Sequence, residues 1–329
     1  MINKITFVLT VVISIAGLIF PQNKVLNPDI ESWKVNYSTV FTDEGQPANE
    51  SIKKLIEKLS SDSGDGLPVS KEEFINYLKR PSAQEIYSKE LIRYATPKSR
   101  YNQKQEHKSY KDVFLKEKRI IAGVEFLKEY KTILAAVERE YGVSRKDIVS
   151  ILMWESGLGE FTGKNYVFNI FMGQLLYLED AQEYAIQQMI AKGEEYPNEY
   201  TDTPQKQKER FAALRNSAVR ALTALLRYAK LYNYDPLEQK GSWGGAIGYT
   251  QFMPYRLDLA IDGDKDGDVD LFSWPDAIYS VANYLREYGK YGWPYKQRKK
   301  AIYSYNHSDD YVHGVIAYAD AIWKMYTGK

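Results

Sequence analysis

Cysteine is absent from the 329 residues of this chain. Its absence excludes disulfide bonds, thiolate zinc sites, a cysteine nucleophile and a lipid-modified N-terminal cysteine. Histidine is scarce, because only His107, His307 and His313 occur, and their spacing is not typical of a zinc site or a catalytic triad. We therefore expect chemistry without a thiolate or a histidine triad, and no organic cofactor.

An excess of charge of one sign is also missing. The chain has 44 Lys and Arg residues against 43 Asp and Glu residues, which gives a formal net charge of +1. Attraction to nucleic acid or to an anionic membrane needs a larger imbalance. Gly244 and Gly248 do not form a phosphate loop, because no strand pattern precedes them and no Gly-Lys-Ser/Thr follows. We expect neither nucleic acid nor another polyanion as a partner.

The N-terminal segment, residues 1–22, is typical of an export signal. Lys4 precedes an apolar run over residues 5–20, and Pro21 ends the run. These 16 residues are short for a membrane-spanning helix, which needs roughly 20. An Ala-x-Ala cleavage site does not follow them, so both cleavage and retention as a membrane tether stay open. We expect an exported protein of the periplasm or cell envelope.

The remaining pattern predicts a mainly α fold. Apolar residues recur every three or four positions over residues 120–141, where Gly142 ends the run, and similar stripes occur at 218–231, 278–288 and 312–322. Alternation with a period of two is not evident. We expect a helical accessory region over residues 23–115, in which Ser70 and Glu73 form a capping box and residues 100–107 form a charged loop. A catalytic domain then covers residues 116–329.

Glu155 is the candidate catalytic residue. Ser144 and Asp147 predict the start of a helix that carries Ile148, Ile151 and Glu155 at spacings of three and four. The carboxyl group therefore shares the apolar face of its helix. Burial raises the pKa of a glutamate, to about 6 in an apolar pocket, so that it can hold a proton near neutral pH. A partly solvated glutamate at a helix end is the competing interpretation of Glu155 taken alone.

Three segments together resemble a known family. Glu-Ser-Gly-Leu-Gly begins at Glu155, Gly-Ala-Ile-Gly-Tyr-Thr-Gln-Phe-Met-Pro ends at Pro254, and Tyr-Asn-His-Ser begins at Tyr305. Their order resembles lytic murein transglycosylases of the B type, which share a lysozyme-like catalytic core. The resemblance runs from about residue 70 to residue 322 and includes Val-Ala-Asn-Tyr at residues 281–284.

The resemblance implies an activity on the glycan strands of peptidoglycan. It implies that Glu155 protonates the oxygen of the MurNAc-GlcNAc β-1,4 bond, then accepts a proton from the C6 hydroxyl, which attacks C1 and leaves a 1,6-anhydroMurNAc end. It also implies a glycan cleft lined by Ser242, Gln251, Tyr305 and Asn306. Side chains such as Gln251 and Asn306 also tie loops together, which is the competing role. Many relatives have Thr-Arg or Thr-Tyr after the glutamate, whereas residues 156–158 are Ser-Gly-Leu here, so those contacts do not carry over.

An acidic loop over residues 262–276 predicts a calcium site. Asp262, Asp264 and Asp266 occupy positions 1, 3 and 5 of an EF-hand loop, glycine occupies position 6, and Asp268 at position 7 would offer its backbone oxygen. Position 12 is a serine instead of the usual glutamate. The family resemblance implies a longer loop that Asp276, at position 15, closes. The alternatives are a solvated acidic turn and a capping role for Asp276.

Three other functions stay open at this point. A lysozyme-like hydrolase needs a second carboxylate, and Glu160 and Asp180 are the nearby candidates. A peptidoglycan-binding module without catalysis does not need a carboxyl group on an apolar helix face. A calcium-dependent structural protein accounts for the acidic loop alone. We expect a monomer that acts on peptidoglycan strands; the sequence does not distinguish internal from terminal cleavage, nor does it identify the tolerated peptides or regulatory partners.

Overall fold

The computed structural model describes residues 33–61, 67–107 and 113–328. The export segment predicted for residues 1–22 lies outside these ranges. Across the described residues, every helix is too short or too polar to cross a membrane.

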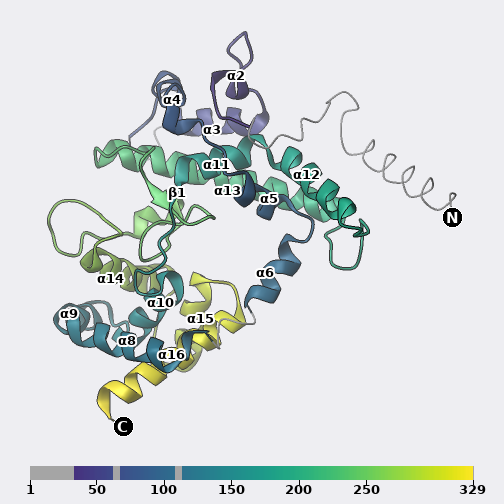
Figure 1. The fold of residues 1–329 in the computed structure, drawn as a ribbon. Helices are drawn as coiled ribbons and strands as arrows, with labels where there is room; N and C mark the ends of the chain where they lie inside the picture. The colour runs from purple at the N-terminus through teal and green to yellow at the C-terminus, as the bar shows by residue number, and fades with distance from the viewer. Residues whose placement is uncertain (1–32, 62–66, 108–112, 329) are drawn as a thin grey trace. The chain divides into compact units, whose positions relative to one another are not determined.

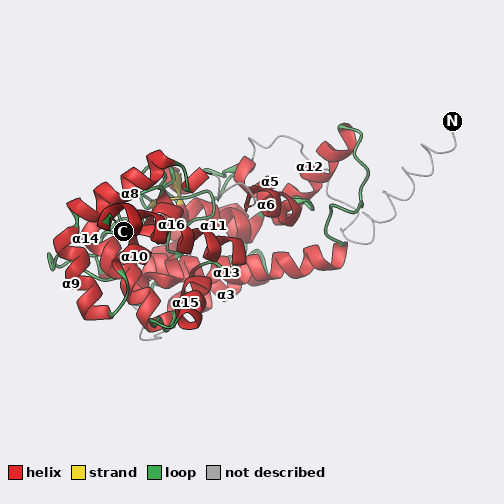
Figure 2. Cartoon of the chain, turned by 90° about the horizontal axis from the view of Figure 1, so that it is seen from below, coloured by secondary structure: helices red, strands yellow, loops and turns green. Residues whose placement is uncertain are grey.

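Helices make up nearly all of the regular structure (Figure 2), which confirms the mainly α fold. The first α-helices are α2 (Tyr37–Val40), α3 (Glu50–Ser60), α4 (Lys71–Leu78), α5 (Ser88–Ala95), α6 (Ser99–His107), α8 (Glu117–Glu129) and α9 (Lys131–Tyr141). They are followed by α10 (Arg145–Ser156), α11 (Val167–Leu176), α12 (Leu178–Ala191), α13 (Pro204–Leu231), α14 (Trp274–Asn283), α15 (Tyr295–Tyr305) and α16 (Asp309–Thr327). Shorter elements are the 3-10 helices η2 (Pro81–Ala83) and η3 (Pro254–Leu259), the π-helical turn η4 (Tyr284–Tyr288), and the strands β1 (Asn165–Tyr166) and β2 (Lys240–Gly241).

The helix ends follow the sequence signals in part. The Ser70 hydroxyl accepts from the Glu73 amide while the Glu73 carboxylate accepts from the Ser70 amide, so the predicted capping box is confirmed. Gly142 ends α9 with a left-handed φ of 66°, as predicted. The helical pattern predicted over residues 120–141 is confirmed, and it divides into two helices because the backbone leaves the helical conformation at Tyr130 and separates α8 from α9.

The charged stretch over residues 100–107 is also not the loop that we expected. It forms most of α6, which packs against α5. The sequence of this helix is polar nearly throughout and shows little apolar periodicity, so the pattern gave no helical signal.

Helix α10 lies at the centre of the packing. It contacts α8, α9, α14 and α16, and these helices surround it in Figure 1. Every residue from Ile148 to Met153 is buried, because neighbours cover several sides of the helix rather than one stripe. A helix fixed on this many sides holds the residue at its C-terminal end, Glu155, in a defined position.

A second group of helices packs around α13. This long helix contacts α3, α11 and η3, and α5 packs on α12. Ile52 and Phe74 belong to the same hydrophobic cluster as Ile148 and Tyr318, so one apolar core joins residues before and after position 115. The division into an accessory region and a catalytic domain at residue 115 stays a prediction.

The two short strands connect the segment after α10 to the segment before η3. Asn165 pairs with Gly241 and Tyr166 with Lys240 in antiparallel register. Gly163 approaches Gly241 so closely, with a φ of 85°, that a Cβ at Gly163 would lie 2.0 Å from the Gly241 carbonyl oxygen. Only glycine allows this contact, which places the loop after Glu155 beside the loop that carries Gln251.

Candidate active site

Glu155 lies in the last turn of α10, as the sequence predicts. Gly157 ends the helix with a left-handed φ of 63°. The Ser156 hydroxyl donates to the Leu152 carbonyl at 3.1 Å and accepts from the Gly159 amide at 3.2 Å, which fixes the turn that follows. Glu155 therefore stands where a buried helix meets a rigid turn.

Helix α10 starts where the sequence predicts, but the contacts at its start differ from a cap. Ser144 occupies the N-cap position, but its side chain makes no capping hydrogen bond. The buried Asp147 carboxylate instead accepts two hydrogen bonds from Arg298, at 2.8 and 2.6 Å, and one from the Tyr291 hydroxyl at 2.6 Å. This buried ion pair anchors α10 to α15 and raises the pKa of Arg298.

The carboxyl group of Glu155 accepts a hydrogen bond from a buried tyrosine. The Tyr311 hydroxyl donates to it at 2.5 Å. Protein surrounds the carboxyl group closely, although part of the residue surface still reaches solvent. Burial raises the pKa of Glu155 to about 7, and the hydrogen bond from Tyr311 opposes this rise. The group can therefore hold or release a proton near neutral pH, as a general acid and base must.

Tyrosine rings form the surroundings of this carboxyl group. The rings of Tyr284 and Tyr305 lie 4.6 Å apart, and the Tyr305 hydroxyl donates to the Thr250 carbonyl at 2.7 Å. Burial, with the charge of Glu155 as a smaller cause, holds the pKa values of Tyr305 and Tyr311 well above their ordinary range. These phenols stay protonated and act as hydrogen-bond donors. We call Glu155, Tyr284, Tyr305 and Tyr311 the Glu155 cluster.

Sequence reasoning found Tyr305 but missed the other two tyrosines. Tyr284 ends the Val-Ala-Asn-Tyr segment, where it served only to mark the family. Tyr311 lies on α16, 156 residues from its partner Glu155. Its six-residue distance from Tyr305 was the available signal, and it is weak because it matches no helical period.

The other predicted glycan contacts have structural partners of their own. The Gln251 side-chain amide donates to the Gly248 carbonyl at 2.9 Å and reaches the Thr162 carbonyl at 3.5 Å. The Ser242 hydroxyl accepts from the Ala246 amide at 3.1 Å, and Asn306 forms the C-cap of α15 beside Tyr305. Gln251 and Ser242 thus stabilise loops, and their contact with a glycan stays a prediction.

The carboxylates considered for a hydrolase lie outside the Glu155 cluster. Glu160 pairs with Arg119 at 2.8 Å, and about half of its side chain is exposed. Asp180 lies in the first turn of α12, which packs against α5. Over the described residues, the pKa of Glu155 responds to burial and to Tyr311 but not to another carboxylate.

The acidic loop brings three of its five predicted ligands together. Asp262, Asp264 and Asp276 each offer a carboxylate oxygen, and these oxygens lie within 4.8 Å of one another. The buried Asp276 accepts hydrogen bonds from the amides of Gly263 and Asp270, which orient it. Burial, together with Asp264 and Asp262, raises the pKa of Asp276. A hard cation would relieve this repulsion, so the oxygen set fits calcium.

The remaining two aspartates make contacts within the loop. The Asp266 carboxylate accepts from the Asp268 amide at 2.9 Å, and the Asp268 carboxylate accepts from the Val269 amide at 2.8 Å. The turn passes through Gly267 with a φ of 97°, as position 6 of an EF-hand loop requires. Their role as metal ligands stays a prediction.

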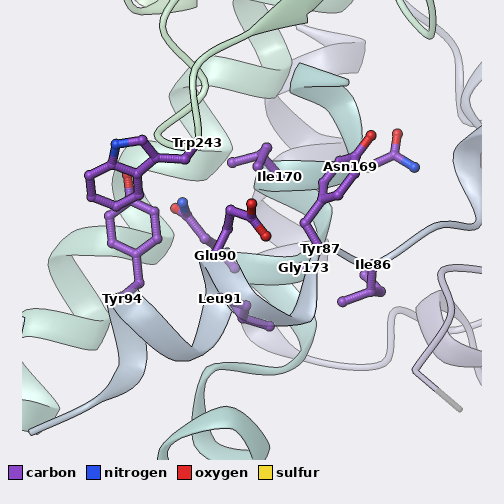
Figure 3. A pocket seen from close by; sticks show the side chains of 10 residues that line it. Ile86, Tyr87, Glu90, Leu91, Tyr94, Asn169, Ile170, Gly173 and Trp243 are labelled. Atoms are coloured by element: carbon purple, nitrogen blue, oxygen red, sulfur yellow. The ribbon is translucent and has the colours of Figure 1, made fainter. Parts of the chain in front are cut away.

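A separate small pocket lies between α5 and α11. Figure 3 shows Trp243 lying against Tyr94 on one side, while the Glu90 side chain points into the space between the helices. The Asn169 side-chain amide donates to the carbonyls of Ser82 and Glu85, which leaves its carbonyl oxygen without a partner. The pocket does not include Glu155, and the buried unpaired oxygen of Asn169 suits a water molecule.

The helical core holds a carboxyl group of raised pKa at the end of a central helix, an arrangement that fits a lysozyme-like fold. The chain belongs to the transglycosylase SLT domain family, whose model matches residues 68–298.

Among curated proteins, the chain is 29% identical over 181 residues to the membrane-bound lytic murein transglycosylase B of Escherichia coli (strain K12). The match covers 55% of this chain and 41% of that protein. Among the solved structures, the chain is similar to Escherichia coli lytic transglycosylase SLT35 in complex with calcium. The match covers 92% of this chain and 100% of that structure's chain, with a TM-score of 0.60 and 19% identity. The match to soluble lytic transglycosylase SltB1 from Pseudomonas aeruginosa covers 67% of this chain and 83% of that structure's chain, with a TM-score of 0.51 and 24% identity. These structures confirm the fold.

Proposed function

We propose that this protein is a lytic transglycosylase that cleaves the MurNAc-GlcNAc β-1,4 bond of peptidoglycan and leaves 1,6-anhydroMurNAc ends. The observation that carries the proposal is the Glu155 carboxyl group, whose pKa is raised to about 7 and which accepts a hydrogen bond from Tyr311. Family membership and the likeness to lytic murein transglycosylase B support it.

The reaction uses one carboxyl group twice. Glu155 donates its proton to the glycosidic oxygen, and positive charge develops at C1 of the muramyl sugar as the bond breaks. The Glu155 carboxylate then accepts the proton of the C6 hydroxyl while that oxygen bonds to C1. The attacking group belongs to the same sugar ring, so the protein does not have to position a water molecule.

The alternatives fit less well. A hydrolase needs a second carboxylate to activate water, and Glu160 is paired with Arg119. A binding module has no use for a buried carboxyl group of raised pKa, which costs folding free energy at neutral pH.

We further propose that Ser242, Gln251, Tyr305 and Asn306 contact the glycan. We also propose that residues 23–115 form an accessory region and that the protein is a monomer. Residues 1–22 would direct its export to the cell envelope, as a signal or as a membrane tether.

Digestion of purified sacculi separates an enzyme from a binding module. We expect the purified protein to release soluble muropeptides, which reversed-phase chromatography detects. Co-sedimentation with the sacculi without release would favour the binding module and contradict the proposal.

The pH dependence should follow Glu155. Because the protonated form acts first, kcat/KM should fall as the pH rises through about 7. Tyr311→Phe removes a hydrogen bond that stabilises the carboxylate, so the pKa of Glu155 should rise and the alkaline limb should move to higher pH. A pH series of kcat/KM for both proteins checks this, and a shift of the variant limb to lower pH would contradict it.

We also propose a structural calcium ion held by Asp262, Asp264 and Asp276, with Asp266 and the backbone of Asp268 completing the shell. Binding would neutralise the grouped carboxylates and favour the folded state. With a Kd of ~10⁻⁴ M, about 1 mM calcium should add roughly 1.4 kcal/mol of stability.

Thermal unfolding in calcium and in chelator measures this gain. Magnesium should give a smaller gain, because it demands a tighter octahedral shell. Asp276→Ala should abolish the gain, whereas Asp270→Ala, outside the proposed ligand set, should keep it. Equal melting temperatures in calcium and in chelator would contradict the proposal that the loop binds calcium.

A further inference from the structure

Arginine and tyrosine side chains form a patch beside the Glu155 cluster. The Arg256 guanidinium lies 3.8 Å from the centre of the Tyr288 ring, 5.8 Å from that of Tyr255 and 6.0 Å from that of Tyr284. Arg220 lies 4.4 Å from the Tyr255 ring. We call these five residues the arginine–tyrosine patch.

Several arginines of this protein are paired with carboxylates, and the two of the patch are not among them. Arg80, Arg145 and Arg298 each form an ion pair with a carboxylate. In the ranges that the structure describes, Arg220 and Arg256 form none. Stacking on a ring occupies the face of a guanidinium and leaves the N–H groups along its edge, which match the two oxygens of a carboxylate.

The patch borders the site of the reaction. Tyr284 belongs to both the patch and the Glu155 cluster, and its ring lies 4.6 Å from that of Tyr305. Burial raises the pKa of Tyr284 to about 12, and the charges of Arg256 and Glu155 act on the same hydroxyl in opposite directions. Because Tyr284 lies between the two groups in this sense, a substituent that extends from the reacting sugar past the Tyr284 ring would meet Arg256.

We infer that Arg256 recognises a carboxylate of the peptides that the glycan strand carries, and that Arg220 extends this surface. The inference rests on the proposed function. The sugars of the strand are neutral and give a guanidinium no charge to pair with, whereas the peptides end in carboxylates. The net charge of the whole chain is only +1, so attraction to an anion has to come from local groups such as these. Arg256 then determines which substituted strands are cleaved efficiently.

Substrate charge and Arg256 can be varied together. The substrate is a soluble peptide-bearing murein oligosaccharide, either untreated or amidated with carbodiimide and ammonia to neutralise its carboxylates. For the wild-type protein, amidation should lower kcat/KM by about 10-fold, mainly through KM, as expected for loss of one charge-assisted pair. Arg256→Gln should lose about as much on the untreated substrate and little more on the amidated one.

Two controls separate recognition from packing. Arg256→Lys keeps the charge without the planar fork and should lose less than Arg256→Gln. Arg139→Gln makes the same charge change at an exposed position on α9 and should behave as wild type. Equal losses for Arg256→Gln on both substrates would overturn the inference, because the residue would then act through packing alone. Failure of the wild-type protein to cleave either substrate would instead overturn the proposed function.

Discussion

Glu155→Gln should lower the rate of murein cleavage by at least about 100-fold, the usual contribution of a positioned general acid or base. Glutamine has nearly the same shape and can still accept the hydrogen bond from Tyr311, but it cannot donate a proton to the leaving oxygen or accept one from the C6 hydroxyl. Release of muropeptides from sacculi under initial-rate conditions measures the loss. A variant with near wild-type activity would remove Glu155 from the mechanism.

The same variant should be more stable than the wild-type protein at alkaline pH. The pKa of Glu155 is raised from 4.5 to about 7, so above pH 4.5 an unfolded chain loses a proton that the folded protein keeps. The contribution of Glu155 therefore becomes less favourable as the pH rises from 4.5 to about 7, then stays constant. Glutamine avoids this cost, so the variant should gain on the order of 1–3 kcal/mol at about pH 8 and little at about pH 4.

Urea unfolding at the two pH values measures this difference. Glu160→Gln is the matched control, because its exposed carboxylate pairs with Arg119 and should contribute less than about 1 kcal/mol. Loss of activity together with a gain in stability at alkaline pH would assign Glu155 to function. Loss of activity together with loss of stability would indicate that the substitution disturbs the fold.

Asp147→Ala should destabilise the protein by about 3–5 kcal/mol, the range for breaking a buried ion pair on one side. The Asp147 carboxylate is fully buried and accepts hydrogen bonds from Arg298 and Tyr291. Its removal leaves the Arg298 guanidinium, with 13% of its side chain exposed, near only the more distant Asp320. Chemical denaturation gives the free energy of unfolding.

A double-mutant cycle isolates the pair. Asp147→Ala combined with Arg298→Ala should cost less than the sum of the single variants, because the double variant buries no unpaired charge. Asp309→Ala is the control, since Asp309 is 70% exposed and meets Lys299 at the surface; it should cost about 1 kcal/mol or less. Strict additivity of Asp147 and Arg298 would contradict a coupled pair.

The sequence predicted the features that depend on local pattern. Spacing along α10 placed Glu155 near the apolar face, Gly142 marked the end of α9, and Ser70 with Glu73 marked the start of α4. Each of these signals lies within a few residues of the feature that it predicts. The family motifs added the fold, which composition and periodicity leave open.

Long-range partners could not be predicted in the same way. Tyr311 reaches Glu155 across 156 residues, and Arg298 reaches Asp147 across 151. Asp147, in the first turn of a helix, has the pattern of a capping residue, and only the packing of α15 makes it a buried ion-pair partner. Helix α6 was missed for a related reason, because it has no apolar stripe.

We propose that Glu155 acts without a second carboxylate, and the mass of the cleavage product distinguishes this mechanism from hydrolysis. Muropeptides released from sacculi by the wild-type protein should end in 1,6-anhydroMurNAc, and each should be lighter by one water than the product of a hydrolase. Liquid chromatography with mass spectrometry distinguishes the two, and the products should resist borohydride reduction because they have no reducing end. Reducing MurNAc ends as the main product would contradict the account and would require a second carboxylate that activates water.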